Sequence, residues 1–159
     1  MYVSAIGQDS HRFDPEGSGK PLTLGGIVIP GCVGLAGNSD ADVVLHAVTN
    51  AISGIHGTPI IGTIADDLCL KQGIKESAVY LNKAMELLKS SAIVHVSIAI
   101  EAKRPKLAGH LNAMRESIAG LLNIKVEHVA ITVTSGEGLT GFGRGEGIQA
   151  FAIVSAQCE

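Results

Sequence analysis

The sequence contains no tryptophan and few other aromatic residues, only two Tyr and three Phe among 159 residues. A core must therefore be built from Val, Ile, Leu and Ala, since 46% of the chain is hydrophobic. A small-residue core with this much apolar surface predicts that part of that surface is buried between subunits. The length is sufficient for one domain with a substantial core, and we expect a single domain over residues 1–159.

Long apolar runs, basic patches and paired cysteines are also missing. No stretch approaches the roughly 18 apolar residues that span a membrane, and residues 1–6 favour a strand over a signal peptide. The net charge is −3 and the basic cluster 103–106 is short, which argues against a nucleic-acid partner. The three cysteines are widely spaced and give no metal or disulfide pattern, so we expect them to be reduced thiols. We therefore expect a cytoplasmic protein with neither a membrane nor a nucleic-acid partner.

The hydrophobic periodicity predicts an α+β fold. Residues 57–75 show no clear element and are expected to form a long loop. The expected order is a mixed or antiparallel sheet packed against helices on one face. The predicted elements are strands over 2–7, 93–101, 127–134 and 148–155, a hairpin over 22–30, and helices over 40–55, 76–90 and 109–122.

Residues 38–46 concentrate more functional side chains than any other stretch. Ser39 followed by Asp42 is typical of a helix start, with a capping side chain and an acid in the first turn. In a helix that starts there, Asp42 and His46 share one face. Two interpretations are open: a polar cap followed by one half-buried histidine, or a site that holds a metal and an anion together.

Asp9 and His11 favour the second interpretation. They are two residues apart, so on an extended chain both side chains point to the same face. Together with His46 they form an Asp, His, His set, which suits zinc. Three protein ligands leave a fourth position open, as catalytic zinc requires.

Glycine is concentrated in residues 134–147, which follow a predicted strand and contain the lone acid Glu137. Glycines allow the backbone to approach a phosphate closely, and a lone carboxylate suits a Mg²⁺ ion shared with phosphates. The segment is not a P-loop, because no Gly-Lys-Ser/Thr ending is present. Residues 103–106 follow another strand and allow either a phosphate contact or a solvated turn.

Taken together, the motifs resemble the 2-C-methyl-D-erythritol 2,4-cyclodiphosphate synthase family over nearly the whole chain. They are Gly-x-Asp-x-His (7–11), Ser-Asp-x-Asp-Val-x-x-His (39–46), Arg-Pro-Lys-Leu (104–107), Met-Arg (114–115), Ser-Gly-Glu-Gly-Leu-Thr (135–140) and Gly-Arg-Gly-Glu-Gly-Ile (143–148).

The resemblance implies a homotrimeric lyase with active sites between adjacent subunits, acting in the non-mevalonate isoprenoid pathway. Such an enzyme cyclises 4-diphosphocytidyl-2-C-methyl-D-erythritol 2-phosphate and releases CMP. By resemblance, Asp9, His11 and His46 bind Zn²⁺, and Glu137 binds Mg²⁺ or Mn²⁺. Asp42 is expected to support the metal-binding helix without touching the metal.

The resemblance also assigns substrate contacts. Asn38 and Ser135 are expected to be catalytic, at positions where the family has phosphate-contacting side chains, and Arg144 and Glu146 match a pair on the trimer axis. The full set of expected substrate-binding residues is Asp9, His11, Asn38, Ser39, Gly62, Asp67, Ala102, Lys106, Leu107, Thr134, Ser135, Glu137 and Arg144.

Several positions depart from the family pattern. Asn38 replaces a His, Gly138 a Lys, Ile60 an Asp and Ser135 a Thr, and Gln8 and Phe142 also stand where the family more often has other residues. Asp66 or Asp67 is a candidate substitute for the acid missing at Ile60. These departures leave two alternatives to the main hypothesis: an enzyme for a related nucleotide diphosphate, or a catalytically silent zinc-containing trimer that binds CMP or isoprenoid phosphates.

Overall fold

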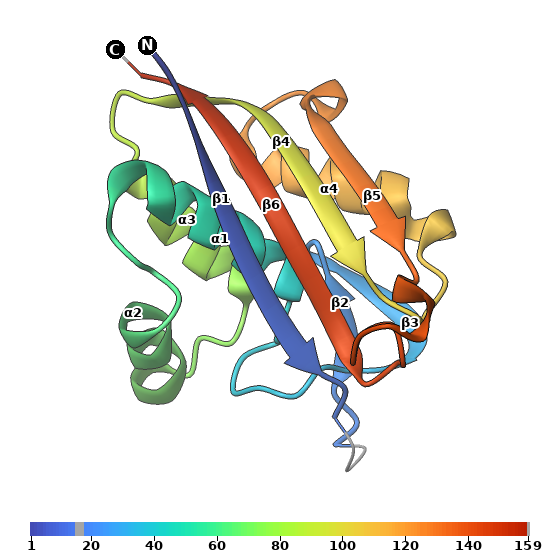
Figure 1. Cartoon of the computed structure of the whole chain (residues 1–159). Helices are drawn as coiled ribbons and strands as arrows, with labels where there is room; N and C mark the ends of the chain where they lie inside the picture. Colours follow the sequence, from blue (N-terminus) through green and yellow to red (C-terminus); the bar gives the residue numbers. More distant parts are fainter. Residues whose placement is uncertain (15–17, 159) are drawn as a thin grey trace.

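A mixed four-stranded sheet forms the framework of the protein (Figure 1). The computed structural model describes residues 1–14 and 18–158. The strand order is β1-β6-β4-β5, in which β1 (Tyr2–Arg12), β6 (Gly147–Gln157) and β4 (Ala92–Glu101) pair antiparallel. β5 (Val129–Thr134) lies parallel to β4. The predicted mixed sheet is confirmed.

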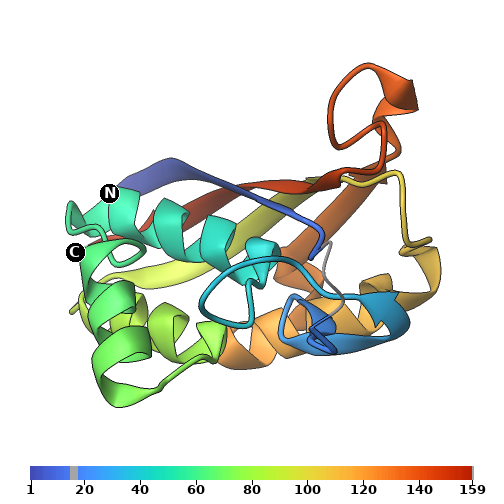
Figure 2. The ribbon, with the colours of Figure 1, turned by 90° about the horizontal axis from the view of Figure 1, so that it is seen from below.

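In the described part of the chain, helices cover only one face of this sheet, as predicted, and the opposite face is bare (Figure 2). The segment that connects β5 to β6 projects beyond the sheet on the bare side (Figure 2). The main helices are α1 (Val43–His56), α3 (Ser77–Glu86) and α4 (Leu111–Leu122). The shorter helical elements are α2 (Thr63–Asp66), the π-helical η1 (Asp67–Lys71) and the 3₁₀ turns η2 (Ala108–His110), η3 (Val126–His128) and η4 (Gly136–Gly138). A separate hairpin consists of β2 (Pro21–Leu24) and β3 (Ile27–Val33).

Helix α1 begins later than predicted, and its cap is Asp42, not Ser39. The Asp42 side chain accepts hydrogen bonds from the N–H groups of Val44 and Leu45 at 3.1 and 3.0 Å. The Ser39 hydroxyl instead accepts the N–H of Ala41 within the preceding turn. A carboxylate has two acceptor oxygens, so Asp42 can cap the helix and at the same time accept hydrogen bonds from another part of the fold.

The Asp42 carboxylate also binds the predicted hairpin, whose turn is Gly25-Gly26. Both glycines have positive φ angles, 61° and 80°, as a two-residue hairpin turn of this hand requires. Their N–H groups donate to the two oxygens of Asp42 at 2.9 and 2.7 Å. Burial raises the pKa of Asp42 to about 6, although the hydrogen bonds from the N–H groups of Leu45, Gly26 and Gly25 lower it. Asp42 thus ties the hairpin to the start of α1, which is the supporting role expected for it.

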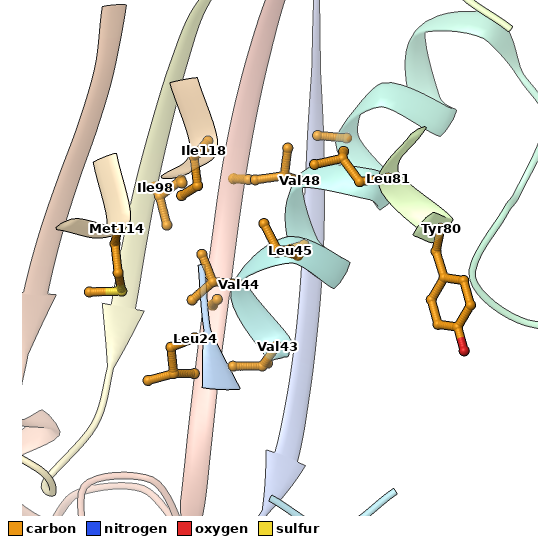
Figure 3. Packing of buried hydrophobic residues seen from close by; sticks show 14 of the residues in the cluster. Leu24, Val43, Val44, Leu45, Val48, Tyr80, Leu81, Ile98, Met114 and Ile118 are labelled. Atoms are coloured by element: carbon orange, nitrogen blue, oxygen red, sulfur yellow. The ribbon is translucent and has the colours of Figure 1, made fainter. Parts of the chain in front are cut away.

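Helix α1 is the centre of the core, because it lies between the sheet and the layer formed by α3, α4 and the hairpin (Figure 3). Apolar residues therefore surround it on all sides instead of forming one stripe. The side chains of α1 that are at most 1% exposed and apolar are Val43, Val44, Leu45, Ala47, Val48, Ala51 and Ile52.

Strand β1 packs directly on α1 at Gly7. A Cβ atom at Gly7 would lie 2.1 Å from the carbonyl oxygen of Ala47 and 2.3 Å from the amide nitrogen of Ala51. No side chain fits between these two backbones. Glycine thus sets the distance between the strand that carries Asp9 and His11 and the helix that carries His46.

Two predicted boundaries were wrong in ways that concern the site. Strand β1 does not end at Gly7 but runs to Arg12, so Asp9 and His11 lie within a paired strand. Residues 57–75 do not form a plain loop, because α2 and η1 occupy 63–71. Their buried side chains, Ala65, Leu68 and Cys69, follow a helical spacing that the surrounding glycines and aspartates masked.

The packing of β1 on α1 predicts the effect of the substitution Gly7→Ala. Because the added methyl group overlaps backbone atoms, we expect the free energy of unfolding to fall by about 3 kcal/mol or more. Urea denaturation measures this change. Gly120→Ala is the matched control: Gly120 lies in α4, and a Cβ atom there would have nothing within 4 Å, so a gain of about 0.5–1 kcal/mol is expected. Equal stabilities for the two variants would contradict this account.

Candidate active site

Three ligand atoms converge where β1 passes the first turn of α1. Asp9 Oδ2 lies 3.0 Å from His11 Nε2 and 2.9 Å from His46 Nδ1, and the two ring nitrogens are 3.4 Å apart. Asp9 and His11 are on the same face of β1, as their spacing predicted. His46 completes the group from α1, and the triad is recognisable as a possible metal-binding cluster.

The orientation of His11 is fixed by the backbone. Its Nδ1 atom lies 2.9 Å from the carbonyl oxygen of Ala36. A carbonyl only accepts, so Nδ1 carries the proton and Nε2 turns a lone pair toward Asp9 and His46. Histidine ligands in metal sites are typically held in this way by a backbone carbonyl on the second nitrogen.

The triad fits a tetrahedral cation. Ligand atoms about 2.0–2.2 Å from a tetrahedral ion are about 3.3–3.6 Å apart. The three observed separations, 2.9, 3.0 and 3.4 Å, are within about half an ångström of these values. A carboxylate oxygen and imidazole lone pairs pointing at one position repel one another unless a proton or a metal lies between them. The donor set excludes a preference for Mg²⁺ or Ca²⁺, which favour oxygen ligands.

The charges of the triad reinforce one another. Burial by itself would raise the pKa of Asp9, but hydrogen bonds and charge interactions with His11 and His46 outweigh it and hold that pKa well below 3.8. The hydrogen bond with Asp9 raises the pKa of His11 above 6.5, although burial opposes this. Asp9 therefore remains ionised, and a metal must displace a proton from His11 at low pH.

A cavity of about 270 Å³ opens beside the triad. Of the residues expected to bind substrate, Asn38, Ser39 and Gly62 line it together with the triad. The Lys20 ammonium group donates to the carbonyl oxygens of Gly37 and Ser39, at 2.6 and 2.8 Å, and so holds the segment on both sides of Asn38.

The two acids after Ile60 are placed differently. Ile60 is 1% exposed and belongs to the core, whereas Asp66 lines the cavity. Asp67, which we expected to bind substrate, is not among the cavity residues and forms an ion pair with Lys71 at 2.9 Å. Of the two candidate substitutes for the missing acid, Asp66 has the position that the interpretation requires.

A second cavity, of about 500 Å³, lies at the carboxyl ends of β4 and β5. These strands are parallel, so their ends meet at one edge of the sheet. The cavity brings together five residues expected to bind substrate, namely Ala102, Lys106, Leu107, Thr134 and Ser135.

The two cavities are far apart in one chain. Asp9 pairs with Ala150, Ala150 with Ile100, and Ile100 with Val133, so the metal triad and the second cavity lie on opposite edges of the sheet. Three strand spacings separate the edges, or about 14 Å. A single chain therefore does not bring its Thr134 and Ser135 hydroxyl groups to its own triad.

The glycine-rich segment is well fixed although it projects from the sheet. The Thr140 hydroxyl donates to the Glu101 carboxylate, and the Arg104 Nε donates to the Gly145 carbonyl oxygen at 3.3 Å. Glu137 is exposed and has a φ of 49°, which is uncommon for a residue other than glycine and is typical of functional positions.

Arg144 and Glu146, which were expected on a trimer axis, pair within the chain. Arg144 Nε lies 2.9 Å from Glu146 Oε1. Both side chains are more than half exposed, so the pair contributes little to stability by itself. The pair is available at the surface of the projecting segment.

Two residues behind His46 escaped the sequence interpretation. His46 Nε2 lies 2.8 Å from the hydroxyl oxygen of Ser77, and that hydroxyl contacts the Asp40 carboxylate. Asp40 stands within the stretch that the sequence singled out, but Ser77 begins a helix 31 residues beyond His46. Only the fold brings it to the triad, so no local signal identifies it.

Comparison with known proteins decides the family. The model of the YgbB family matches residues 2–157. The chain belongs to the YgbB family. A curated relative from Chlamydia caviae, named 2-C-methyl-D-erythritol 2,4-cyclodiphosphate synthase, is 48% identical over 98% of this chain and 89% of its own length. The resemblance drawn from the motifs, and the prediction of an enzyme of this family, are therefore confirmed.

Solved structures of YgbB-like proteins share the fold. The bifunctional IspDF from Campylobacter jejuni matches with a TM-score of 0.88 and 30% identity, over 98% of this chain and 42% of its own. A 2C-methyl-D-erythritol-2,4-cyclodiphosphate synthase in its CDP-bound form matches with a TM-score of 0.86 and 30% identity, over 98% of this chain and 100% of its own. No described helix of this YgbB-family chain is long and apolar enough to cross a membrane.

The electrostatics of the triad predict a pH dependence for the protein kept metal-free with EDTA. The folded-state pKa of His11 is raised, so its contribution to stability is fully present below pH 6.5 and is lost as pH rises through the raised value. The pKa of Asp9 is depressed, so its contribution is present above pH 3.8 and is lost as pH falls below it.

Urea denaturation of wild type and His11→Gln across this range is the measurement. The difference between them should be largest between about pH 4 and pH 6.5 and should shrink at higher pH. His128→Gln, which changes an exposed histidine of η3 outside the triad, is the control for the His-to-Gln substitution itself. A difference for His11→Gln that grows above pH 7 would have the wrong sign.

Proposed function

We propose that this protein is a cytoplasmic enzyme that cyclises 4-diphosphocytidyl-2-C-methyl-D-erythritol 2-phosphate to 2-C-methyl-D-erythritol 2,4-cyclodiphosphate with release of CMP. The observation that carries the proposal is the convergence of Asp9, His11 and His46 on one point beside a cavity, in a member of the YgbB family. Its relatives bear the name of this synthase. The cytoplasm suits its three free cysteines, because thiols stay reduced there.

The reaction needs no nucleophile from the protein. An oxygen of the substrate's 2-phosphate forms a bond to the β-phosphorus, the bond from that phosphorus to the oxygen bridging it to the α-phosphorus breaks, and CMP leaves with the bridging oxygen. Catalysis then consists of positioning the two phosphates and neutralising their charge. The chain provides rigid elements for this, since the triad lies on a paired strand and a buried helix.

Asp9, His11 and His46 would hold Zn²⁺, and Glu137 would hold Mg²⁺ or Mn²⁺. The bound cations would supply Lewis-acid neutralisation of the diphosphate arm. Asn38, Ser39 and Asp66 line the cavity beside the triad. Asn38 and Ser39 would donate to phosphate oxygens, and Asp66 would accept from the hydroxyl groups of the methylerythritol.

The second cavity would bind the cytidine end of the substrate. Ala102, Lys106 and Leu107 line this cavity, and Thr134 and Ser135, which also line it, would offer hydroxyl groups to phosphates. The CDP-bound structure of a relative that is 30% identical supports a cytidine nucleotide as the ligand class.

The distance between the two cavities supports a homotrimer with active sites between subunits. A substrate that reaches both needs the second cavity of a neighbouring chain, because about 14 Å of sheet separates them within one chain. The bare sheet face supplies apolar contacts: Ile6 pairs with Ile153 and is 66% exposed, and Ile153 is 48% exposed. Side chains of this kind are usually covered by a partner.

Incubation of the purified protein with the diphosphocytidyl substrate, Zn²⁺ and Mg²⁺ tests the function. We expect CMP and the cyclic diphosphate to form in equal amounts, as measured by ³¹P NMR. His46→Ala should abolish both products. Substrate binding without CMP release would support the silent alternative. Activity that appears only in the Asn38→His, Gly138→Lys double variant would then assign the loss to those two departures.

The proposed role of Glu137 predicts a change in the Mg²⁺ requirement. Glu137→Gln keeps the size of the side chain but removes its charge, so half-maximal activity should need about tenfold more Mg²⁺, or a larger excess still, while bound zinc stays the same. Glu127→Gln, at an exposed acid outside both cavities, is the control. Superimposable Mg²⁺ titrations for the two variants would refute the role.

A further inference from the structure

The hydrogen bonds behind His46 form a chain that ends in a carboxylate. His46 Nε2, on the side of the ring away from Asp9, lies 2.8 Å from Ser77 Oγ. The same Ser77 oxygen contacts Asp40 Oδ1. Ser77 is completely buried, so no solvent competes for its hydroxyl proton.

The positions of the protons in this chain follow from hydrogen-bond chemistry. A hydroxyl group has one proton to donate, and an ionised carboxylate only accepts. Ser77 therefore donates to Asp40, and its oxygen is left to accept from His46 Nε2–H. His46 then has its lone pair on Nδ1, the atom that faces Asp9 and His11.

Asp40 is held in place independently of His46. Its Oδ2 accepts the Ser77 N–H at 3.0 Å, and its Oδ1 accepts the Asp42 N–H at 3.1 Å. Its own N–H donates to the Lys75 carbonyl oxygen at 2.9 Å. The carboxylate is thus anchored between the start of α1 and the start of α3, and it orients the Ser77 hydroxyl.

We propose that Ser77 and Asp40 are positioning residues that fix the metal-binding form of His46, with Ser77 accepting the Nε2 proton and Asp40 orienting Ser77. The inference rests on the proposed role of the triad as a zinc site. Neither residue touches the metal position. Partners of this kind, behind a histidine ligand, raise its basicity and typically account for 10–100-fold in metal affinity.

The test compares zinc affinities by competition with a chromophoric chelator. Ser77→Ala should raise the zinc Kd about 10–100-fold, because the Nε2 proton loses its only acceptor among the described contacts of that atom. Asp40→Asn should raise it less, about 3–10-fold, since the amide supplies one acceptor oxygen instead of two. Should Ser77→Ala fail to fold, Asp40→Asn carries the test.

A double variant tests whether the two residues act in one chain. If Asp40 acts through Ser77, the zinc Kd of Asp40→Asn, Ser77→Ala should equal that of Ser77→Ala alone. Ser53→Ala is the matched control, because Ser53 is also buried and polar and lies on α1, but its oxygen accepts the Ile60 N–H. Its zinc Kd should stay within about twofold of wild type.

A spectroscopic readout separates positioning from simple loss of stability. In the zinc-loaded wild type, the His46 Nε2 proton should give a slowly exchanging ring N–H resonance, identified by its disappearance in His46→Ala. That resonance should exchange rapidly in Ser77→Ala. An unchanged zinc Kd in Ser77→Ala, or an additive loss in the double variant, would overturn the proposal. Wild type that binds no zinc would overturn the metal centre itself, and the proposal with it.

Discussion

Close packing of strand β1 on helix α1 determines where the chemistry lies. Gly7 allows the two backbones to touch, and two residues later Asp9 begins the alternation that turns His11 to the same face. The helix is held from the other side by Asp42, whose carboxylate binds both its first turn and the hairpin. Three ligand atoms within 3.4 Å of one another are the consequence. The triad is therefore a product of core packing, and not of a flexible loop that closes on a ligand.

The same rigidity keeps the two cavities of one chain apart. The triad lies at one edge of the sheet, and the cavity lined by Leu107 and Thr134 lies at the other. Strand pairing fixes this separation, and no side chain rearrangement shortens it. In the proposed homotrimer, a partner chain on the bare, partly apolar sheet face (Figure 2) would bring the two kinds of residue together.

Much of this could be predicted from the sequence, since strand alternation, helix periodicity and the Gly25-Gly26 turn are local signals. The convergence of Asp9, His11 and His46 could be predicted because each part of the triad has its own short motif. The cap on α1 was misassigned because Ser39 and Asp42 both qualify locally, and only the buried contact with the hairpin favours Asp42. Ser77 could not be predicted at all, because its contact with His46 depends on the packing of α3 against α1.

The most direct test is a crystal structure of the protein with zinc and CDP, with anomalous diffraction recorded at the zinc edge. The account predicts one strong peak bonded to Asp9 Oδ2, His11 Nε2 and His46 Nδ1, and a cytidine ring held by residues 102–107 of a neighbouring subunit. Zinc bound elsewhere, or a nucleotide whose base and phosphates are held by one chain alone, would contradict it.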